Sequence, residues 1–366
     1  MKSLFLLLFA AITSSCFSQD YNVTSIVPLD GEVFETSGLI WLDGRLITHN
    51  DSGSDHFLYE IDTVDGEVTR RVVVANATNV DWEDICFDEE YIYIGDFGNN
   101  YGNRTDLRIY KISISDYLTT ENDTVYCDTI FFNYTDQESF EPALYTTNYD
   151  AEAIIAKGDS LYIFTKNWGD IKTNIYAISK TPDTYSISIV DSLDPEGLIT
   201  GACYDEEKNE LLLTGYSFTT PFLMFVSSFT DTDFSEGNIV KWLPTFEGSF
   251  QIEGVTALGE HSFFVSSEKN GEALSYLHRI NVFDFLNVGV KSTNKISIYP
   301  TMVNKDVLYV NNTNLYGIFI YDLNGRIVKS GFGNEIELSS LKNSCYIVLL
   351  KDAKGNIVLR ERIVKI

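Results

Sequence analysis

The sequence predicts an all-β protein: a five-bladed β-propeller, with six blades as the alternative, followed by a small antiparallel β-sandwich. Two observations favour this fold class. No segment shows a sustained helical period of apolar residues, whereas short alternating or apolar runs recur about every 8 to 15 residues between Gly, Asp and Asn turns. Units of four such runs also repeat about every 50 residues, which is typical of propeller blades.

The first 19 residues are typical of an export signal. Lys2 precedes an apolar run that is far shorter than the roughly 20 residues of a membrane span, and no later apolar run is longer. We expect cleavage near Ser18 or Gln19 and a mature protein without a membrane span. One alternative is a lipoprotein lipidated at Cys16, which Thr13 disfavours because a lipobox normally has Leu there. The other is a buried N-terminal strand.

The charges are distributed unevenly along the chain. The 366 residues include 53 Asp and Glu against 26 Lys and Arg, for a formal net charge of -27. Residues 287–366 hold 11 of the basic residues and only 6 of the acidic ones, so residues 20–286 carry the whole acidic excess. We therefore expect a propeller over 20–286, a linker over 287–294 and a separate domain over 295–366. An acidic body repels phosphate backbones and anionic lipid, which argues against nucleic-acid or membrane-surface binding and favours cations or basic partners.

Five repeats are visible in the acidic body. Their spacings are 46, 69, 48 and 53 residues, so the longest interval indicates an insertion within 113–147. Outer, fourth strands are expected at 68–74, 125–133, 185–191 and 239–243. The last repeat lacks a fourth strand, and we expect 21–27 to return and close the ring. The alternative is a two-sheet sandwich, which would not need a repeat of this period.

The first strand of each propeller blade lines the central channel, so equivalent repeat positions form columns that face it. The first column is Ser37, Glu83, Glu152, Thr200 and Glu253, and the second is Asn50, Asp96, Lys166, Tyr216 and Glu268. Converging carboxylates repel one another unless they are protonated, paired or bound to a cation, and such oxygen ligands suit calcium. In the alternative interpretation, the glutamates accept hydrogen bonds from backbone N–H groups of neighbouring blades and only hold the ring together.

Three dense motifs lie beside these columns: NDSG at 50–53, DWED at 81–84 and GDFGNN at 95–100. With these motifs the sequence resembles a group of bacterial propellers loosely akin to esterase-like phytases and gluconolactonases. The resemblance covers residues 36 to about 285 in architecture, but the motifs match well only in 48–104. It implies a similar calcium-binding face near the axis and transfers no catalytic residue. The candidate metal ligands are Glu83, Glu152, Glu253, Asp96, Asn50 and Asp51. Each Asp or Asn is equally explained as a turn former.

Other catalytic arrangements are weak. The sequence has no HExxH, CxxC, G-x-S-x-G, P-loop or G-x-G-x-x-G motif. Ser52 lies beside Asp51 and His49, but triad members come together through folding and rarely stand side by side in sequence. Aromatic residues could stack on a sugar at the rim, although aromatics in strands more often form core between blades. The aromatic candidates are Trp82, Trp168 and Tyr216.

The tail from about residue 295 contains short alternating strands joined by turns at Asn324-Gly325 and at 354–356, which predicts a small antiparallel sandwich. Tyr299-Pro300, the run YDLNGRIV at 321–328 and the basic end resemble, in this order, the type A C-terminal sorting domain of the type IX secretion system. Thr301-Met302 and Ser344-Cys345 depart from that pattern. The resemblance implies a Bacteroidota protein that is released or attached at the cell surface after the tail is removed, with the type IX machinery as the partner of 295–366. The alternative is a carbohydrate-binding or Ig-like accessory module.

Two classes of function follow. The first is a secreted or surface binding module that presents a calcium-associated face to a glycan or protein. The second is a secreted metal-dependent hydrolase of phosphoesters or lactones, in which an axial metal activates water. The acidic net charge disfavours a polyanionic substrate unless calcium compensates, and no cluster of Lys or Arg occupies the columns, where Lys166 is the one basic residue. Binding is therefore the preferred interpretation.

Four cysteines remain after the signal: Cys86, Cys127, Cys203 and Cys345. Cys86 and Cys203 fall at equivalent positions of the second and fourth repeats, which are not neighbours in a ring. Their Cα atoms should then exceed the ~7 Å limit for a disulfide. We expect no disulfide in the propeller and free, buried thiols that act as small apolar residues.

Overall fold

The computed structural model describes residues 21–53, 55–217, 220–244, 246, 251–259, 262–269, 271 and 274–282, and then 298–299, 302–303, 307–310, 316–322, 326–351 and 357–365. The expected signal at 1–19 and the linker at 287–294 lie outside these residues. The chain divides into two compact units, Met1–Phe285 and Leu286–Ile366.

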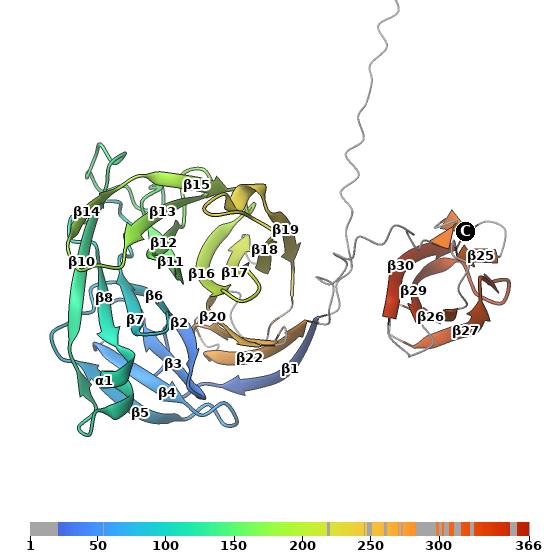
Figure 1. Cartoon of the computed structure of the whole chain (residues 1–366), viewed down its shortest axis with the longest axis horizontal. Helices are drawn as coiled ribbons and strands as arrows, with labels where there is room; N and C mark the ends of the chain where they lie inside the picture. The colour runs from blue at the N-terminus through green and yellow to red at the C-terminus, as the bar shows by residue number, and fades with distance from the viewer. Residues whose placement is uncertain are drawn as a thin grey trace, which may run out of the picture. The chain divides into compact units, whose positions relative to one another are not determined.

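Five sheets form the first unit, and Figure 1 shows them arranged in a ring. Sheets I and II each have five strands. Sheet I consists of β2 (Thr36–Leu42), β3 (Arg45–Asn50), β4 (Phe57–Ile61), β5 (Val68–Val74) and β9 (Thr124–Val125). Sheet II consists of β6 (Trp82–Phe87), β7 (Tyr91–Asp96), β8 (Arg108–Ser113), β10 (Cys127–Tyr134) and β14 (Thr184–Ile187).

The remaining three sheets of this unit have four strands each. Sheet III consists of β11 (Ala151–Lys157), β12 (Ser160–Thr165), β13 (Thr173–Ser179) and β15 (Ile189–Leu193). Sheet IV consists of β16 (Leu198–Asp205), β17 (Glu210–Ser217), β18 (Thr220–Ser227) and β19 (Asn238–Trp242). Sheet V consists of β20 (Ile252–Gly259), β21 (Ser262–Ser267), β22 (Tyr276–Val282) and β1 (Tyr21–Pro28).

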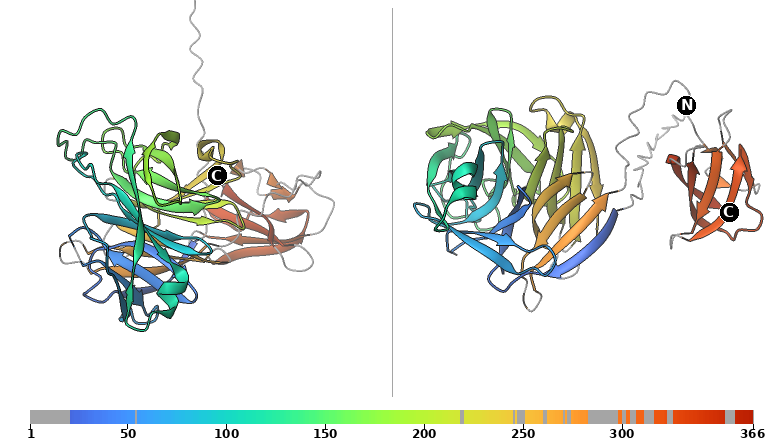
Figure 2. Two further views of the ribbon diagram at one scale, coloured as in Figure 1. Left: turned by 60° about the vertical axis from the view of Figure 1, so that its left-hand side comes forward. Right: turned by 60° about the horizontal axis from the view of Figure 1, so that its bottom comes forward.

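The N-terminal strand completes the last sheet. β1 pairs antiparallel with β22, from Tyr21 opposite Val282 to Pro28 opposite Tyr276. The chain segment predicted to return thus supplies the outer strand of sheet V. Figure 2 shows β1 (blue) beside the orange strands of that sheet.

Outer strands also join neighbouring sheets. The expected single strand at 125–133 is β9 and β10, and the expected strand at 185–191 is β14 and β15. β9 pairs parallel with β5 of sheet I, and β14 pairs parallel with β10 of sheet II. These strands divide because their first segment extends the preceding sheet while their second segment belongs to the following one. The predicted insertion contains α1 (Ile114–Thr119), whose first turn is capped by the Ser113 hydroxyl accepting from Asp116 N.

An apolar core lies between each pair of adjacent sheets. Sheets I and II share one core, and the same holds for II with III, III with IV, and IV with V. A fifth core contains Leu39 and Leu46 of sheet I together with Phe264 and Leu277 of sheet V. Because the last sheet packs on the first, each sheet buries both faces against neighbours, as a propeller requires. A short 3₁₀ helix, η1 (Phe234–Glu236), packs Phe234 into the core of sheets III and IV.

The second unit has two sheets that share one apolar core, in which Ile318, Ile320, Val348 and Leu350 are buried. The smaller sheet is β23 (Ile298–Tyr299), β25 (Val307–Val310) and β28 (Glu335–Glu337). The larger is β24 (Met302–Val303), β30 (Ile357–Lys365), β29 (Ser344–Lys351), β26 (Tyr316–Tyr321) and β27 (Ile327–Gly333). The expectation of purely antiparallel pairing is wrong at one edge, because β24 pairs parallel with β30. Within the described residues, no helix is long and apolar enough to cross a membrane.

Candidate functional site: an axial carboxylate cluster

The innermost strands of the five sheets, β2, β6, β11, β16 and β20, approach one another closely around the axis. A Cβ atom at Gly38 would lie 2.6 Å from Ile85 N, and one at Gly201 would overlap Glu253 O. Both glycines directly follow a first-column residue. Thr200 Oγ1 also donates to Ile252 O at 2.5 Å, which ties β16 to β20. The small residues therefore let the column side chains converge.

One axial carboxylate has a purely structural arrangement. Asp84 is fully buried, and its Oδ2 accepts hydrogen bonds from Ile154 N at 2.9 Å and Ala202 N at 3.2 Å. Its Oδ1 accepts from Ile85 N at 2.8 Å. Burial raises the pKa of Asp84 well above its usual value, although the three N–H groups oppose that rise. Asp84, and not a glutamate of the first column, has the ring-holding role that the alternative interpretation assigns to the glutamates.

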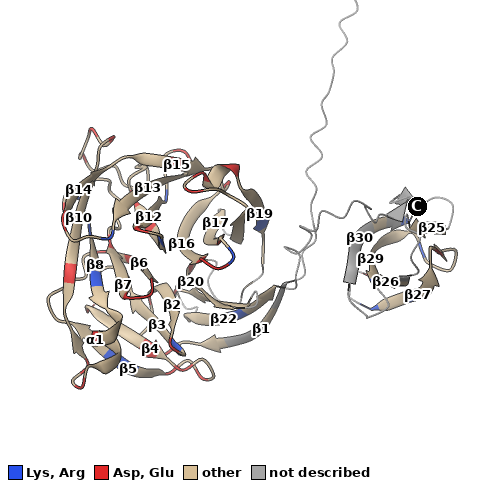
Figure 3. Cartoon of the chain, in the orientation of Figure 1, with Lys and Arg blue, Asp and Glu red and all other residues tan. Residues whose placement is uncertain are grey.

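Five other carboxylates gather at the start of the inner strands, and we call them the axial cluster: Asp51, Asp81, Glu83, Asp150 and Glu152. They form two triads, Asp51 with Asp81 and Glu83, and Glu83 with Asp150 and Glu152. Within each triad, one oxygen of each carboxylate lies within 4.8 Å of the others. Glu83 belongs to both triads and is the centre of the cluster. Figure 3 shows acidic residues around the ring, including near its centre.

Glu83 has no hydrogen-bond donor for its carboxylate among the residues that the structure describes, although only 4% of it is exposed. The backbone beside it is unusually close. A Cβ atom at Gly98 would contact the carboxylate oxygens of Glu83 and Asp81, so this glycine leaves room for both side chains in their present positions. A carboxylate with so little exposure and four others around it is costly to keep charged unless it is bound to a cation.

The pKa values reflect this crowding. Burial, followed by repulsion from Asp51, Glu152, Asp81 and Asp150, raises the pKa of Glu83 well above its usual range. Burial and the charge of Asp150 raise the pKa of Asp81 to about 6. The pKa values of the three remaining cluster members are raised as well, in each case chiefly by burial. Every carboxyl of the cluster thus holds a proton more tightly than it would in water.

Lys166 is the buried cation next to the cluster. Its Nζ lies 3.1 Å from Glu152 Oε1 and over the rings of Trp168 at 5.1 Å and Tyr216 at 5.6 Å. Burial lowers the pKa of Lys166, but Glu152 and the other acidic neighbours raise it well above its usual value, so the amine stays charged. One ammonium group cannot balance five carboxylates.

The residues predicted as metal ligands separate into two groups. Glu83, Glu152 and Asp51 lie in the axial cluster. Asp96 is instead paired with two guanidinium groups, Arg104 at 3.0 Å and Arg108 at 3.3 Å. The remaining two predicted ligands, Asn50 and Glu253, lie outside both triads.

Asn50 braces a loop, because its Nδ2 donates to Glu32 O at 2.7 Å and its Oδ1 accepts from Glu35 N at 3.3 Å. Glu253 is 6% exposed, and its Oε2 has no hydrogen-bond partner within the described part of the chain. Its charge raises the pKa of Glu152, and the pKa of Glu253 is itself raised well above its usual value, chiefly by burial.

Two cluster members, Asp81 and Asp150, are absent from the sequence-based ligand set. Each precedes a first-column glutamate by two residues, in Asp81-Trp82-Glu83 and Asp150-Ala151-Glu152. This Asp-x-Glu spacing recurs at the start of two inner strands, and its repetition is the signal that could have identified the two aspartates.

A polar hollow of about 290 Å³ opens beside the cluster. Asp81 is a member of the axial cluster and also lines this hollow. The lining residues are Ser52, Asp81, Asn99, Asn100, Tyr101, Asn103, Arg104, Leu144 and Tyr145. The NDSG and GDFGNN motifs therefore lie at a surface depression and at the cluster edge at once.

The adjacent His49 and Ser52 do not form a triad. His49 is fully buried, and its ring packs edge-on against Trp82 with centroids 5.5 Å apart. Its Nδ1 is 3.2 Å from Asn50 O, and burial lowers its pKa to about 4. Ser52 is exposed and lines the hollow.

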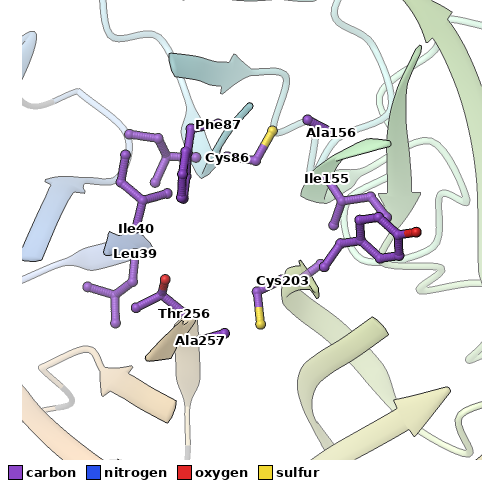
Figure 4. A pocket seen from close by; sticks show the side chains of 12 residues that line it. Leu39, Ile40, Cys86, Phe87, Ile155, Ala156, Cys203, Thr256 and Ala257 are labelled. Carbon is purple, nitrogen blue, oxygen red and sulfur yellow. The ribbon is translucent and has the colours of Figure 1, made fainter. Parts of the chain in front are cut away.

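The opposite end of the inner strands encloses an apolar pocket of about 90 Å³ (Figure 4). Its lining comes from all five inner strands and includes Leu39, Ile155 and Ala257. Cys86 of β6 and Cys203 of β16 also line it, and Figure 4 shows the two thiols on separate strands across the pocket. Both are free, as are Cys127 and Cys345, which agrees with the expectation of unpaired cysteines; the expected burial holds for Cys86 and Cys127, but Cys203 is only partly buried. Burial raises the pKa of both pocket thiols.

Comparisons with known proteins give similarities of fold only. No family model and no curated protein matches the chain. A DUF4623 family protein from Bacteroides eggerthii is 9% identical with a TM-score of 0.39, over 73% of this chain and 77% of that one. The extracellular domain of a hybrid two-component system protein from B. thetaiotaomicron is 10% identical with a TM-score of 0.31, over 88% of this chain and 49% of that one. The WD40 β-propeller domain of Doa1 is 9% identical with a TM-score of 0.31, over 93% and 86%. At these TM-scores the neighbours carry no argument about function, and the propeller assignment rests on the sheets and cores described above.

Proposed function

We propose that this chain is an exported, five-bladed β-propeller binding protein whose axial cluster binds calcium. The observation that carries the proposal is Glu83, a buried carboxylate with no hydrogen-bond donor in the described structure, shared by two triads of carboxylates. A bound divalent cation offsets the repulsion that otherwise forces protons onto these groups.

The donor set favours calcium over other metals. The triads contain carboxylates only, without the His or Cys ligands that zinc prefers. Magnesium usually keeps several waters and binds one or two carboxylates, whereas calcium accepts six to eight oxygens in a flexible geometry. Five carboxylates, two in inner strands and three in the loops beside strands, suit the larger ion.

Five blades are supported by the five inter-sheet cores and by β1 closing sheet V. Export is supported by the signal-like first 19 residues and by the pattern of the tail, which resembles a type IX sorting domain. The two-sheet unit at the C-terminus has the size expected of such a sandwich. The tail, residues 295–366, then binds the type IX secretion machinery. The acidic propeller, residues 20–286, is the mature part that is secreted or exposed at the cell surface.

Calcium titration of the full chain tests the metal site. We expect calcium to raise the melting temperature and chelator to reverse the rise, with about 2.7 kcal/mol of added stability at a hundredfold excess over Kd. Glu83→Gln should abolish the response, because it removes the charge shared by both triads. Glu89→Gln, at an exposed turn, is the matched control and should respond like the wild type. Identical melting curves for the wild type in calcium and in chelator would refute the proposal.

A metal-dependent hydrolase is the second candidate function. Asp81 favours it, because this carboxylate belongs to the axial cluster and also lines the hollow, where a substrate would meet the metal. Calcium-dependent turnover of phosphoesters or lactones, lost in Asp81→Asn, would support an enzyme. Calcium binding without turnover of either class would support the binding protein.

A further inference from the structure

We propose that the polar hollow binds a neutral, polyhydroxylated ligand of the sugar class, whose hydroxyl groups complete the coordination of the axial cation. This inference rests on the proposed calcium site and names the ligand that the site presents. Its basis is the juxtaposition of the hollow with the axial cluster through Asp81, which belongs to both.

The basic residue in the hollow is not available to an anion. Arg104 Nε donates to Asp106 at 3.1 Å, and its two NH groups donate to Gly98 O at 2.9 Å and Asp96 Oδ1 at 3.0 Å. The two aspartates neutralise its charge, and Asp81 adds a negative group to the wall. A phosphate, sulfate or carboxylate group would therefore find no free cationic side chain in the hollow and would depend on the proposed axial cation alone.

The rim offers aromatic surface instead. Tyr101 and Tyr145 line the hollow, and 51% and 54% of their surfaces are exposed. The Tyr145 ring packs on Trp168 with centroids 4.7 Å apart, and Trp168 Nε1 donates to Asp150 Oδ2 at 2.8 Å. The ring is thus held in place by a residue that is itself anchored to the axial cluster. The apolar face of a sugar ring can pack on such a tyrosine.

Side-chain amides supply the polar contacts. Asn100 and Asn103 line the hollow, and their side chains have no hydrogen-bond partner within the described part of the chain. An amide both donates and accepts, so it matches hydroxyl groups, which do the same. A volume of about 290 Å³ lies near the lower end of the roughly 300–1,000 Å³ range of small-molecule sites, which suits one or two sugar rings. Aromatic surface and free amides beside the proposed cation site together favour a polyol ligand, whose hydroxyl groups would bind the cation.

The test is glycan-array and calorimetric binding of the full chain, in excess calcium and in chelator. The array holds neutral, sialylated and sulfated glycans, and phosphate esters and a lysine-rich peptide are tested alongside. We expect binding to neutral glycans in calcium only. Tyr145→Ala should weaken that binding about tenfold, a loss equivalent to ~1.4 kcal/mol, while calcium affinity stays unchanged. Tyr126→Ala, an exposed tyrosine outside the hollow, is the matched control and should bind both like the wild type.

The outcomes separate the two proposals. Calcium binding without neutral-glycan binding overturns the ligand class and leaves the metal site standing. Preference for anionic glycans, for phosphate esters or for the basic peptide overturns the ligand class in the same way. Absence of calcium binding overturns the metal site and this inference with it. Glycan binding that Tyr145→Ala leaves unchanged places the ligand elsewhere on the ring and refutes the hollow as its site.

Discussion

Crowding decides the chemistry of individual residues in the axial cluster. Asp81 and Glu83 are ordinary carboxylic acids in sequence, but burial and neighbouring carboxylates raise both pKa values. Asp96, which looks equivalent in the repeat, lies between Arg104 and Arg108 and is neutralised by them. Partners that fold next to a residue therefore separate a ligand-like carboxylate from a structural one.

The raised pKa values predict an unusual pH dependence of stability. Because the pKa of Asp81 is about 6 when folded and about 3.9 when unfolded, the folded state binds more protons between these values. The free energy of unfolding of cation-free protein should therefore rise as the pH falls from 7 to 4, by at most about 3 kcal/mol from this group. Denaturant unfolding at several pH values in chelator measures it.

Two comparisons isolate the source of this pH effect. In Asp81→Asn, the free energy of unfolding should rise less on acidification than in the wild type, because the contribution of Asp81 is missing. Calcium should remove the rise altogether, because a bound cation keeps the carboxylates ionised and protons then compete with it. A cation-free wild type that loses stability steadily from pH 7 to 4, in parallel with Asp81→Asn, would contradict the assignment.

At the scale of the element, the inner strands depend on one another through few polar contacts. Asp84 of β6 accepts from backbone N–H groups of β11 and β16, and no other carboxylate in the described hydrogen-bond network joins three inner strands. Asp84 directly follows Glu83 in β6. This strand therefore supplies both the carboxylate that joins three inner strands and the centre of the axial cluster.

Asp84→Ala should lower the free energy of unfolding by about 3 kcal/mol or more, because it leaves three buried N–H groups without an acceptor. Asp84→Asn keeps the size and one carbonyl oxygen and should lose less. Chemical denaturation of both variants measures the effect, and the exposed Glu89→Gln variant provides the baseline. An unfolding midpoint of Asp84→Ala equal to that of the wild type would show that water or another group satisfies these N–H groups.

The whole molecule consists of a ring and a separate C-terminal unit, each with its own apolar core. The ring is closed by β1 on β22 and by the core shared by sheets I and V, so no strand of the tail is needed for it. The two units are therefore expected to fold independently.

Removing residues 287–366 tests this independence together with the proposed export route. The truncated chain should unfold in one cooperative transition and keep the calcium response of the full chain, because the axial cluster lies entirely within the first unit. In a Bacteroidota host with the type IX system, it should not reach the medium or the cell surface. Normal export without the tail would refute its sorting role, and loss of folding would show that the ring needs it.

The sequence by itself determined the strand repeat, the two-part organisation, the returning strand at 21–27 and three members of the axial cluster. These features follow from local hydrophobic periodicity and repeat spacing, which do not depend on how the sheets pack against one another. Only the tertiary structure decided which polar residues meet. Asp96 and Asp150 are both acidic residues at the ends of strands, yet one folds against two arginines and the other against Glu83. Contacts between sheets that are distant in sequence decide which side chains of each inner strand point toward the axis. These contacts therefore decide that Asp84 holds the inner strands together while Glu83 belongs to the axial cluster. The sequence shows which residues are carboxylic acids. The free energy of ionising each one depends on the dielectric environment and on the partners that folding places around it.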